Sequence, residues 1–177
     1  KKITPRKGNV VFINPSLDYE SEDIRSDKTI WPYPGLMILQ SVLAEGGYDA
    51  KLIDSNLYIE SEFRKRLFDT IDEETIFVGF GLMTVNVVWA YSVMKEIKKR
   101  YPNLKILVGG FHPTLFPDQM INDKHIDVVA LNESASIILA LTDAIKNDGD
   151  LSKINGIYYK EKGKVHRNPP NTKLDDA

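Results

Sequence analysis

Residues 76–84 read IFVGFGLMT, and this stretch decides the class of fold. Its first five residues are mostly β-branched or aromatic, which is typical of a strand that is buried on both faces. Gly81 then permits a tight turn. A helix is predicted next, with one apolar side formed by Val87, Val88, Tyr91, Met94 and Ile97. The stretch therefore predicts a strand, a turn and a helix in succession, the unit from which parallel sheets are built.

The same alternation continues on both sides of this unit. Short apolar runs predict further strands at residues 10–13, 50–54, 104–108 and 127–131. Apolar residues at helical spacing predict helices over residues 34–46, 60–71, 117–122 and 137–145, and two last runs, 156–159 and 164–167, pair as a hairpin. Together they predict an α/β domain with a doubly wound, five-stranded parallel sheet, helices on both faces and a C-terminal β-hairpin.

Composition narrows the class of protein. The 177 residues suit a single domain, and 42% hydrophobic with 27% charged residues indicates a globular chain. The net charge of -2 gives no basic surface for nucleic acid. No apolar run is long enough to cross a membrane, so we expect no membrane partner and a cytoplasmic location. The absence of cysteine excludes disulfides and thiolate-held clusters from this chain.

In doubly wound sheets a ligand binds outside the carboxyl ends of the strands, where the winding reverses. The loop after the first strand, Asn14-Pro15-Ser16, lacks the Ser, Thr and Gly run of a flavin phosphate site. It also lacks the acidic pair with which a phospho-acceptor domain holds magnesium. The acidic residues 18–23 that follow are expected to form a solvated loop.

Glycines follow the third and fourth strands. Gly79-Phe80-Gly81 begins like a dinucleotide fingerprint, but Thr84 replaces the third glycine and the motif follows the wrong strand. Gly81 and the pair Gly109-Gly110 are open to two interpretations: a simple turn, or a seat where a bulky ligand lies against backbone. In the second, Thr84 and Asn86 add hydrogen bonds from the start of the next helix.

Polar residues near these loops also have two interpretations. His112 is expected to be an exposed loop histidine, and its spacing from His125 is not that of a metal site, so a contact to a ligand is favoured over catalysis. His125 and His166 are expected at the surface. Asn132 and Glu133 suit a cap for the last helix, and a ligand contact would come in addition. We find no convincing catalytic group.

Five motifs occur in the order and spacing of one family. They are residues 14–16 (NPS), 33–36 (YPGL), 78–84 (VGFGLMT), 108–114 (VGGFHPT) and 127–129 (DVV). This ordered set resembles the N-terminal, flavodoxin-like (Rossmann-like) domain of cobalamin-dependent radical S-adenosylmethionine proteins, which include methyltransferases and the magnesium-protoporphyrin monomethyl ester oxidative cyclase. The likeness runs from about residue 10 to residue 170, and the NPP at residues 168–170 is also typical of that family.

The resemblance implies that the strand-end loops bind cobalamin, mainly by shape and backbone hydrogen bonds. Carried over by position, the implied contacts are Asn14, Pro15, Ser16, Pro34, Gly35, Gly81, Leu82, Thr84, Gly109, Gly110, Phe111 and His112. We add Asn86, Asn132 and Glu133 from their places in the loops. The first loop lacks the D-x-H-x-x-G motif of classical cobalamin domains, so no lower imidazole is expected from it.

The resemblance also implies a larger protein. In that family the next domain carries the C-x-x-x-C-x-x-C motif for an iron-sulfur cluster and cleaves S-adenosylmethionine. We therefore expect residues 1–167 to be a cobalamin-binding domain without catalytic residues of its own, and residues 168–177 to be a linker toward a radical S-adenosylmethionine domain of the same parent chain.

Two alternatives remain. Gly81 stands where the family usually has Ser, and Leu131-Asn132-Glu133-Ser134 stands where it usually has G-E-G-E. These departures favour a degenerate, cofactor-free structural or interaction domain. The other alternative is a flavodoxin-like enzyme that binds a different nucleotide, which the loops after the first and third strands disfavour.

Overall fold

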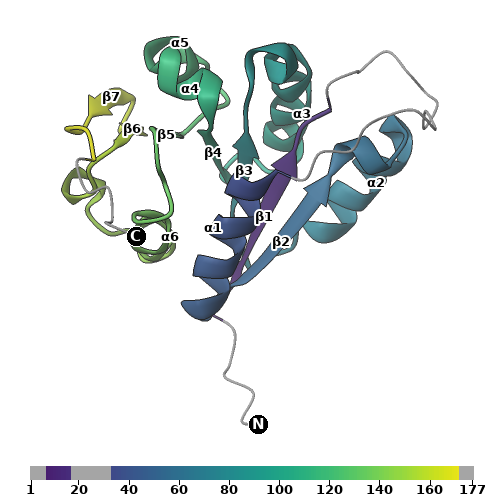
Figure 1. Cartoon of the computed structure of the whole chain (residues 1–177), viewed down its shortest axis with the longest axis horizontal. Helices are drawn as coiled ribbons and strands as arrows, with labels where there is room; N and C mark the ends of the chain where they lie inside the picture. Colours follow the sequence, from purple (N-terminus) through teal and green to yellow (C-terminus); the bar gives the residue numbers. More distant parts are fainter. Residues whose placement is uncertain (1–6, 17–32, 172–177) are drawn as a thin grey trace, which may run out of the picture.

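The computed structural model describes residues 7–16 and 33–171. It contains one mixed sheet in the order β2-β1-β3-β4-β5-β6-β7 (Figure 1). Strands β1 to β5 pair in parallel, β6 is antiparallel to β5, and β7 is antiparallel to β6. The strands are β1 (Asn9–Asn14), β2 (Asp49–Asp54), β3 (Thr75–Gly81), β4 (Lys105–Gly109), β5 (Val128–Ala130), β6 (Ile157–Glu161) and β7 (Lys164–Arg167).

This arrangement confirms the doubly wound fold with five parallel strands and a C-terminal hairpin. The hairpin also extends the sheet, because β6 pairs with β5 through residues 128–130. The solvated loop expected at residues 18–23 lies outside the described residues. Asn168, at the start of the expected linker, donates its side-chain amide to the carbonyls of Leu151 and Ile154, both at 2.7 Å. This segment therefore begins on the surface of the domain.

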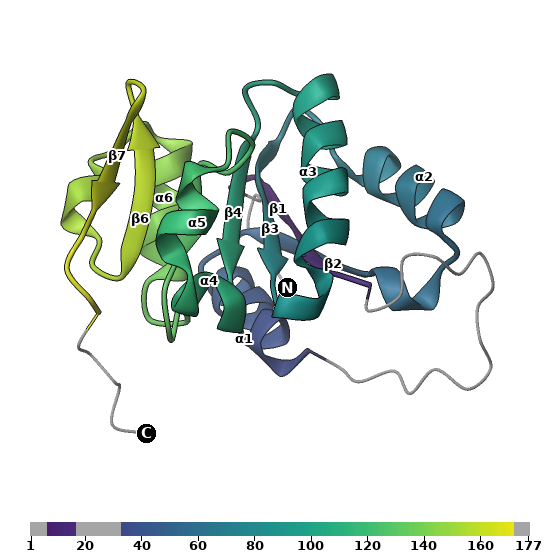
Figure 2. The same ribbon diagram turned by 90° about the horizontal axis from the view of Figure 1, so that it is seen from above.

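Helices cover both faces of the sheet. They are α1 (Pro34–Glu45), α2 (Glu60–Thr70), α3 (Val87–Arg100), α4 (Phe111–Leu115), α5 (Pro117–Asn122) and α6 (Ile138–Lys146). In Figure 2, α3, α4 and α5 lie in front of the sheet, with α1 and α6 behind it. Short 3-10 turns are η1 (Ser55–Leu57), η2 (Thr84–Asn86) and η3 (Leu151–Lys153). Helix α4 was not predicted, because five residues are too few to show a helical period.

Each face of the sheet has its own core. Val11, Val78 and Ile106 belong to the cluster that packs against α2, α3 and α5. Phe12 and Leu107 point to the opposite cluster, with α1 and α6. This alternation is what the period of two along a strand produces. Val88 was wrongly placed on the buried side of its helix: it is 68% exposed, because it lies about 100° around the helix from Val87.

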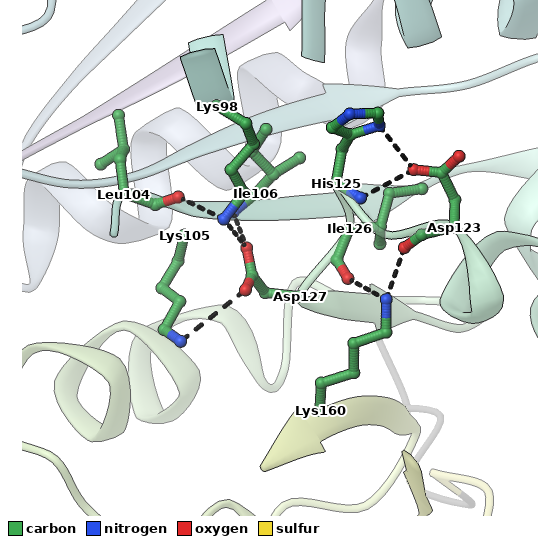
Figure 3. Close-up of polar contacts among 9 residues, drawn as sticks. All are labelled: Lys98, Leu104, Lys105, Ile106, Asp123, His125, Ile126, Asp127 and Lys160. Carbon is green, nitrogen blue, oxygen red and sulfur yellow. Dashed lines mark hydrogen bonds and ion pairs between the residues drawn. The ribbon is translucent and has the colours of Figure 1, made fainter. Parts of the chain in front are cut away.

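The amino ends of β4 and β5 are joined by charged groups (Figure 3). The Asp127 carboxylate accepts hydrogen bonds from the Lys98 ammonium at 2.7 Å and from the Ile106 amide at 2.8 Å. Lys105 adds an ion pair to Asp127 at 3.7 Å. Lys160, from β6, donates to the carbonyls of Asp123 and Ile126. Helix α3 and strands β4, β5 and β6 are thereby linked at this end of the sheet.

Two histidines expected at the surface are half-buried instead. His125 lies before β5, and its ring nitrogen Nδ1 is 3.0 Å from the Asp123 carboxylate. The ring of His166 stacks on Tyr159, with 4.9 Å between ring centroids. Their polar sequence surroundings indicated a surface position, but these contacts with Asp123 and Tyr159 bury part of each ring. Within residues 7–16 and 33–171, no helix has the length and apolar character needed to cross a membrane.

Candidate functional site

A pocket opens at the carboxyl ends of the parallel strands, between α1 and α6. Its volume is about 120 Å³. Strand ends form its floor, the first turns of α1 and the start of α6 form its walls, and the loop after β5 contributes polar groups. The lining residues are Phe12, Tyr33, Gly35, Leu36, Leu39, Phe80, Gly81, Leu107, Gly109, Gly110, Ala130, Asn132, Glu133, Ser134 and Ile138. This is the edge where doubly wound sheets bind ligands.

Three glycines form the floor of the pocket. Gly81 and Gly109 end β3 and β4 and are direct partners in the parallel ladder. Gly110 follows with a φ of 101°, which side chains rarely adopt. A Cβ on Gly110 would lie 2.9 Å from both the amide nitrogen and the carbonyl oxygen of Leu82. The backbone itself is therefore the surface that faces the pocket.

Backbone hydrogen bonds hold the two glycine loops together. The Leu82 amide donates to the Gly109 carbonyl at 2.7 Å, and the Leu82 carbonyl accepts from the His112 amide at 3.1 Å. The Leu82 side chain is fully buried in the core on the opposite face of the sheet. Leu82 therefore fixes the shape of the floor and does not line the pocket.

His112 is buried in α4 and is not an exposed loop residue, which corrects the sequence-based expectation. Its Nδ1 lies 3.1 Å from the Thr84 hydroxyl, and its ring packs on Phe116 with centroids 5.0 Å apart. Its Nε2 is buried and has no hydrogen-bond partner among the described residues. Burial lowers the pKa of His112 from its usual value of 6.5, so the imidazole is neutral at pH 7.

The loop after β5 brings Asn132, Glu133 and Ser134 to the pocket wall. Asn132 has a φ of 55°, and its amide donates to the Thr114 hydroxyl at 2.9 Å. The Glu133 carboxylate accepts from the Ala135 amide at 2.9 Å. The expectation that these two residues cap α6 is wrong, because that helix begins only at Ile138. Their side chains belong to the turn before the helix.

The predicted site residues separate into two groups. Six of them line the pocket together: Gly35, Gly81, Gly109, Gly110, Asn132 and Glu133. The others lie around it or elsewhere on the same edge. Asn14 ends β1 and Pro15 follows it, and their carbonyls accept hydrogen bonds from the side chains of Ser55 and Asn56 in η1.

The remaining predicted residues differ in exposure. Pro34, Thr84 and Phe111 are exposed, and Ser16 is buried next to the end of β1. Asn86 is buried, and its side-chain oxygen accepts from the Met83 amide at 3.0 Å. Asn86 thus stabilises the turn before α3 instead of facing the pocket.

Sequence reasoning missed most of the apolar lining. Leu36, Leu39 and Ile138 look like ordinary core positions, because their helical spacing is the same whether the buried face meets a core or a pocket. Tyr33 was quoted within a motif but was not assigned a contact. Its side chain lies over the floor, and burial raises the pKa of its hydroxyl. Its place directly before Pro34, at the start of α1, was the available signal.

The described residues contain no group of three or more His, Asp or Glu side chains that is placed to hold a metal ion. The pocket itself combines apolar walls with the polar residues Asn132, Glu133 and Ser134, a lining that suits an organic group recognised by shape and hydrogen bonds.

Comparisons with known proteins concern the domain as a whole. The family model described as "B12 binding domain" matches residues 23–142. An uncharacterized methyltransferase of Pyrococcus horikoshii is 32% identical over 145 residues, covering 80% of this chain and 31% of that protein. The anaerobic magnesium-protoporphyrin IX monomethyl ester cyclase of Synechocystis is 24% identical over 170 residues, covering 94% and 34%. The chain thus spans about a third of the length of these relatives.

Solved structures show the same fold. The cobalamin-dependent S-adenosylmethionine radical enzyme OxsB, with aqua-cobalamin and S-adenosylmethionine bound, superposes with a TM-score of 0.74 at 21% identity, over 93% of this chain and 22% of that one. The radical S-adenosylmethionine methyltransferase TsrM of Kitasatospora setae, with cobalamin and a [4Fe-4S] cluster bound, gives 0.72 at 18% identity, over 94% and 29%.

Proposed function

Because this chain belongs to the family of B12-binding domains, we propose that the pocket between α1 and α6 receives the nucleotide tail of cobalamin, with the corrin ring over the strand ends. The glycine floor is the observation that carries this proposal. Gly81, Gly109 and Gly110 lie side by side at the carboxyl edge without side chains, which lets the flat base of the nucleotide tail approach the backbone within contact distance. Apolar side chains of α1 and α6 then cover this base from the sides.

The polar groups of the site fit the outer parts of such a ligand. Asn132, Glu133 and Ser134 line one wall, where they meet the hydroxyl and amide groups of a nucleotide tail. His112 acts indirectly in this proposal. Its buried ring contacts Thr84 and its amide is bonded to Leu82, so it positions two loops of the cradle without reaching the cofactor metal.

We further propose that this chain supplies no imidazole to cobalt. The loop after β1 contains no histidine, and its D-x-H-x-x-G motif is absent. His112 is buried in α4, His125 precedes the amino end of β5, and His166 lies on β7. Only His112 lies at the carboxyl edge, and its ring is buried against Thr84 and Phe116. The electron paramagnetic resonance spectrum of the Co(II) form tests this: splitting from a protein nitrogen would contradict it.

In the whole protein, this domain would hold and orient cobalamin for a radical S-adenosylmethionine domain elsewhere in the same parent chain. Bound cobalamin supplies the chemistry of accepting and transferring a methyl group, as in a methyltransferase, or takes part in an oxidative cyclisation. The contribution of this chain is to bind the cofactor and to fix its orientation, since we assign none of its residues to catalysis. S-adenosylmethionine and the iron-sulfur cluster belong to that other domain.

A cofactor-free structural domain is the second candidate. Its support is Gly81, which lacks the family's usual hydroxyl, and the Tyr33 ring that covers the floor. The two candidates differ in whether the pocket between α1 and α6 binds the nucleotide tail of cobalamin.

Cobinamide, which carries the corrin ring but no nucleotide tail, tests the seat directly. We expect the domain to bind hydroxocobalamin more tightly than cobinamide in equilibrium dialysis. The Gly81→Val variant is expected to lose this preference, because its side chain enters the pocket and displaces only the flexible side chains of Tyr33 and Leu36. Equal affinities for both corrins in the unaltered domain would contradict the tail placement, and no binding of either would favour the cofactor-free candidate.

A further inference from the structure

Tyr33 lies directly over the glycine floor. A Cβ built on Gly81 would be 2.8 Å from Cε1 of the Tyr33 ring and 3.1 Å from its Cζ. A Cβ built on Gly110 would be 2.8 Å from the Tyr33 hydroxyl oxygen. The phenol ring therefore spans from the end of β3 to the residue after β4, across the surface that a flat ligand group would use.

The backbone of Tyr33 is held by the start of α1, while its side chain lies outside the helix. Tyr33 is the N-cap of α1, and its carbonyl accepts the amides of Leu36 at 3.1 Å and Met37 at 3.3 Å. Pro34 follows at the first position of the helix, so the ring is attached at a rigid point and can change position by rotation about its own side-chain bonds. Burial raises the pKa of Tyr33, as expected for a phenol withdrawn from water.

We propose that Tyr33 is a displaceable lid, which rests on the glycine floor in the ligand-free domain and must swing away before a planar aromatic group can occupy the same place. This inference rests on the proposed function and names the residue that controls access to its site. The ring covers the floor with an aromatic face of the kind that the ligand would bring.

The lid has a kinetic consequence. A ligand that binds only the open form meets a domain in which the competent fraction is small, so its apparent affinity is reduced by that fraction. The observed rate of association should also level off at high ligand concentration, where opening of the lid becomes limiting. Removal of the ring should abolish both effects.

Stopped-flow absorbance with hydroxocobalamin tests the proposal on the domain itself. Tyr33→Ala removes the ring, and Tyr33→Phe keeps the ring without the hydroxyl. Met37→Ala is the matched control, because Met37 lies one turn along α1, is 48% exposed and does not line the pocket. Circular dichroism and a thermal melt establish that each variant is folded.

We expect a saturating rate for the unaltered domain, Tyr33→Phe and Met37→Ala. Tyr33→Ala should associate about tenfold faster or more, with a rate linear in ligand concentration and a lower dissociation constant. Binding by Tyr33→Ala alone would also support the lid. Equal rates in the unaltered domain and Tyr33→Ala, or weaker binding by Tyr33→Ala, would overturn the lid alone. Failure of every variant to bind would overturn the lid and the proposed function together.

Discussion

The two ends of the sheet differ in their residues: paired charged side chains lie at the amino end and glycines at the carboxyl end. At the amino ends of β4 and β5, charged side chains saturate one another: Asp127 is held by Lys98, Lys105 and a backbone amide. At the carboxyl ends of the same strands, Gly109 and Gly110 leave bare backbone, and the buried Nε2 of His112 has no described partner. The strands thus join a region that holds the fold together to a region that we propose binds a ligand.

The comparison teaches that stability and binding are separable in this domain. Substitutions at the amino end should lower the free energy of unfolding and leave corrin affinity unchanged, provided that the domain remains folded. Substitutions at the carboxyl end should change affinity, and those that strain the backbone or replace a buried group there should change stability as well.

Gly110→Ala should have the largest effect, because it acts on both quantities. The residue needs a φ of 101°, and the added Cβ would collide with the Leu82 backbone. We expect a loss of about 3 kcal/mol in the free energy of unfolding and weaker corrin binding by about tenfold or more. Urea denaturation and a binding titration measure the two.

Gly163→Ala is the matched control for Gly110→Ala. Gly163 has a φ of 76° in the turn between β6 and β7, and a Cβ there would meet nothing within 4 Å. Gly163→Ala therefore introduces the same kind of backbone strain as Gly110→Ala, but without a collision and away from the pocket. Equal losses of stability and affinity in the two variants would show that the floor is not special.

Asp127→Ala should be the strongest single test of the amino end. The change leaves the Lys98 ammonium, whose side chain is 15% exposed, without its carboxylate, and it removes the acceptor of the Ile106 amide. We expect a loss of about 2 to 3 kcal/mol in the free energy of unfolding, measured with urea, and an unchanged dissociation constant for hydroxocobalamin. A fall in affinity without a fall in stability would break the division between the two ends.

His112 should make stability depend on pH. Burial lowers its pKa in the folded domain, so the unfolded chain binds more protons in the window between that lowered pKa and 6.5. The contribution is fully present above pH 6.5 and is lost as the pH falls through the folded pKa. We expect the thermal melting temperature to drop from about pH 7.5 to about pH 5 in the unaltered domain, and to drop less in His112→Leu. Parallel curves would exclude His112 as the cause.

Asp118→Ala should have the smallest effect. The Asp118 carboxylate pairs with the Arg167 guanidinium at 2.6 Å, and both side chains are about half exposed. Exposed pairs of this kind contribute about 0 to 1 kcal/mol, because water and salt screen them. Urea denaturation in low and high salt measures this, and a loss as large as that of Asp127→Ala would mean that charge alone, without burial, sets the strength of the amino end.

The fold was readable because strands and helices leave local patterns. The run at residues 76–80, the helical spacing from Leu36 to Leu43 and the glycines at the third and fourth strand ends located these elements to within a few positions. Helix α4 was missed because its five residues show no period. Asn132 was wrongly expected to cap α6, because the residues 133–137 separate it from the first residue of that helix.

The site was only partly readable, and the reason is physical. Glycines at strand ends carry a signal of their own, which a simple turn and a ligand seat share. Leu36, Leu39 and Ile138 carry none, because an apolar side chain that faces a pocket obeys the same pattern as one that faces a core. The placement of Tyr33 over Gly81 depends on contacts between residues 48 positions apart, which no local pattern records.

One measurement tests the central claim most directly: the domain is mixed with hydroxocobalamin, free ligand is removed by gel filtration, and the visible spectrum of the protein fraction is recorded. The account predicts stoichiometric corrin absorbance in the unaltered domain and in Asp127→Ala, with reduced absorbance in Gly110→Ala. A colourless protein fraction from the folded, unaltered domain would contradict it.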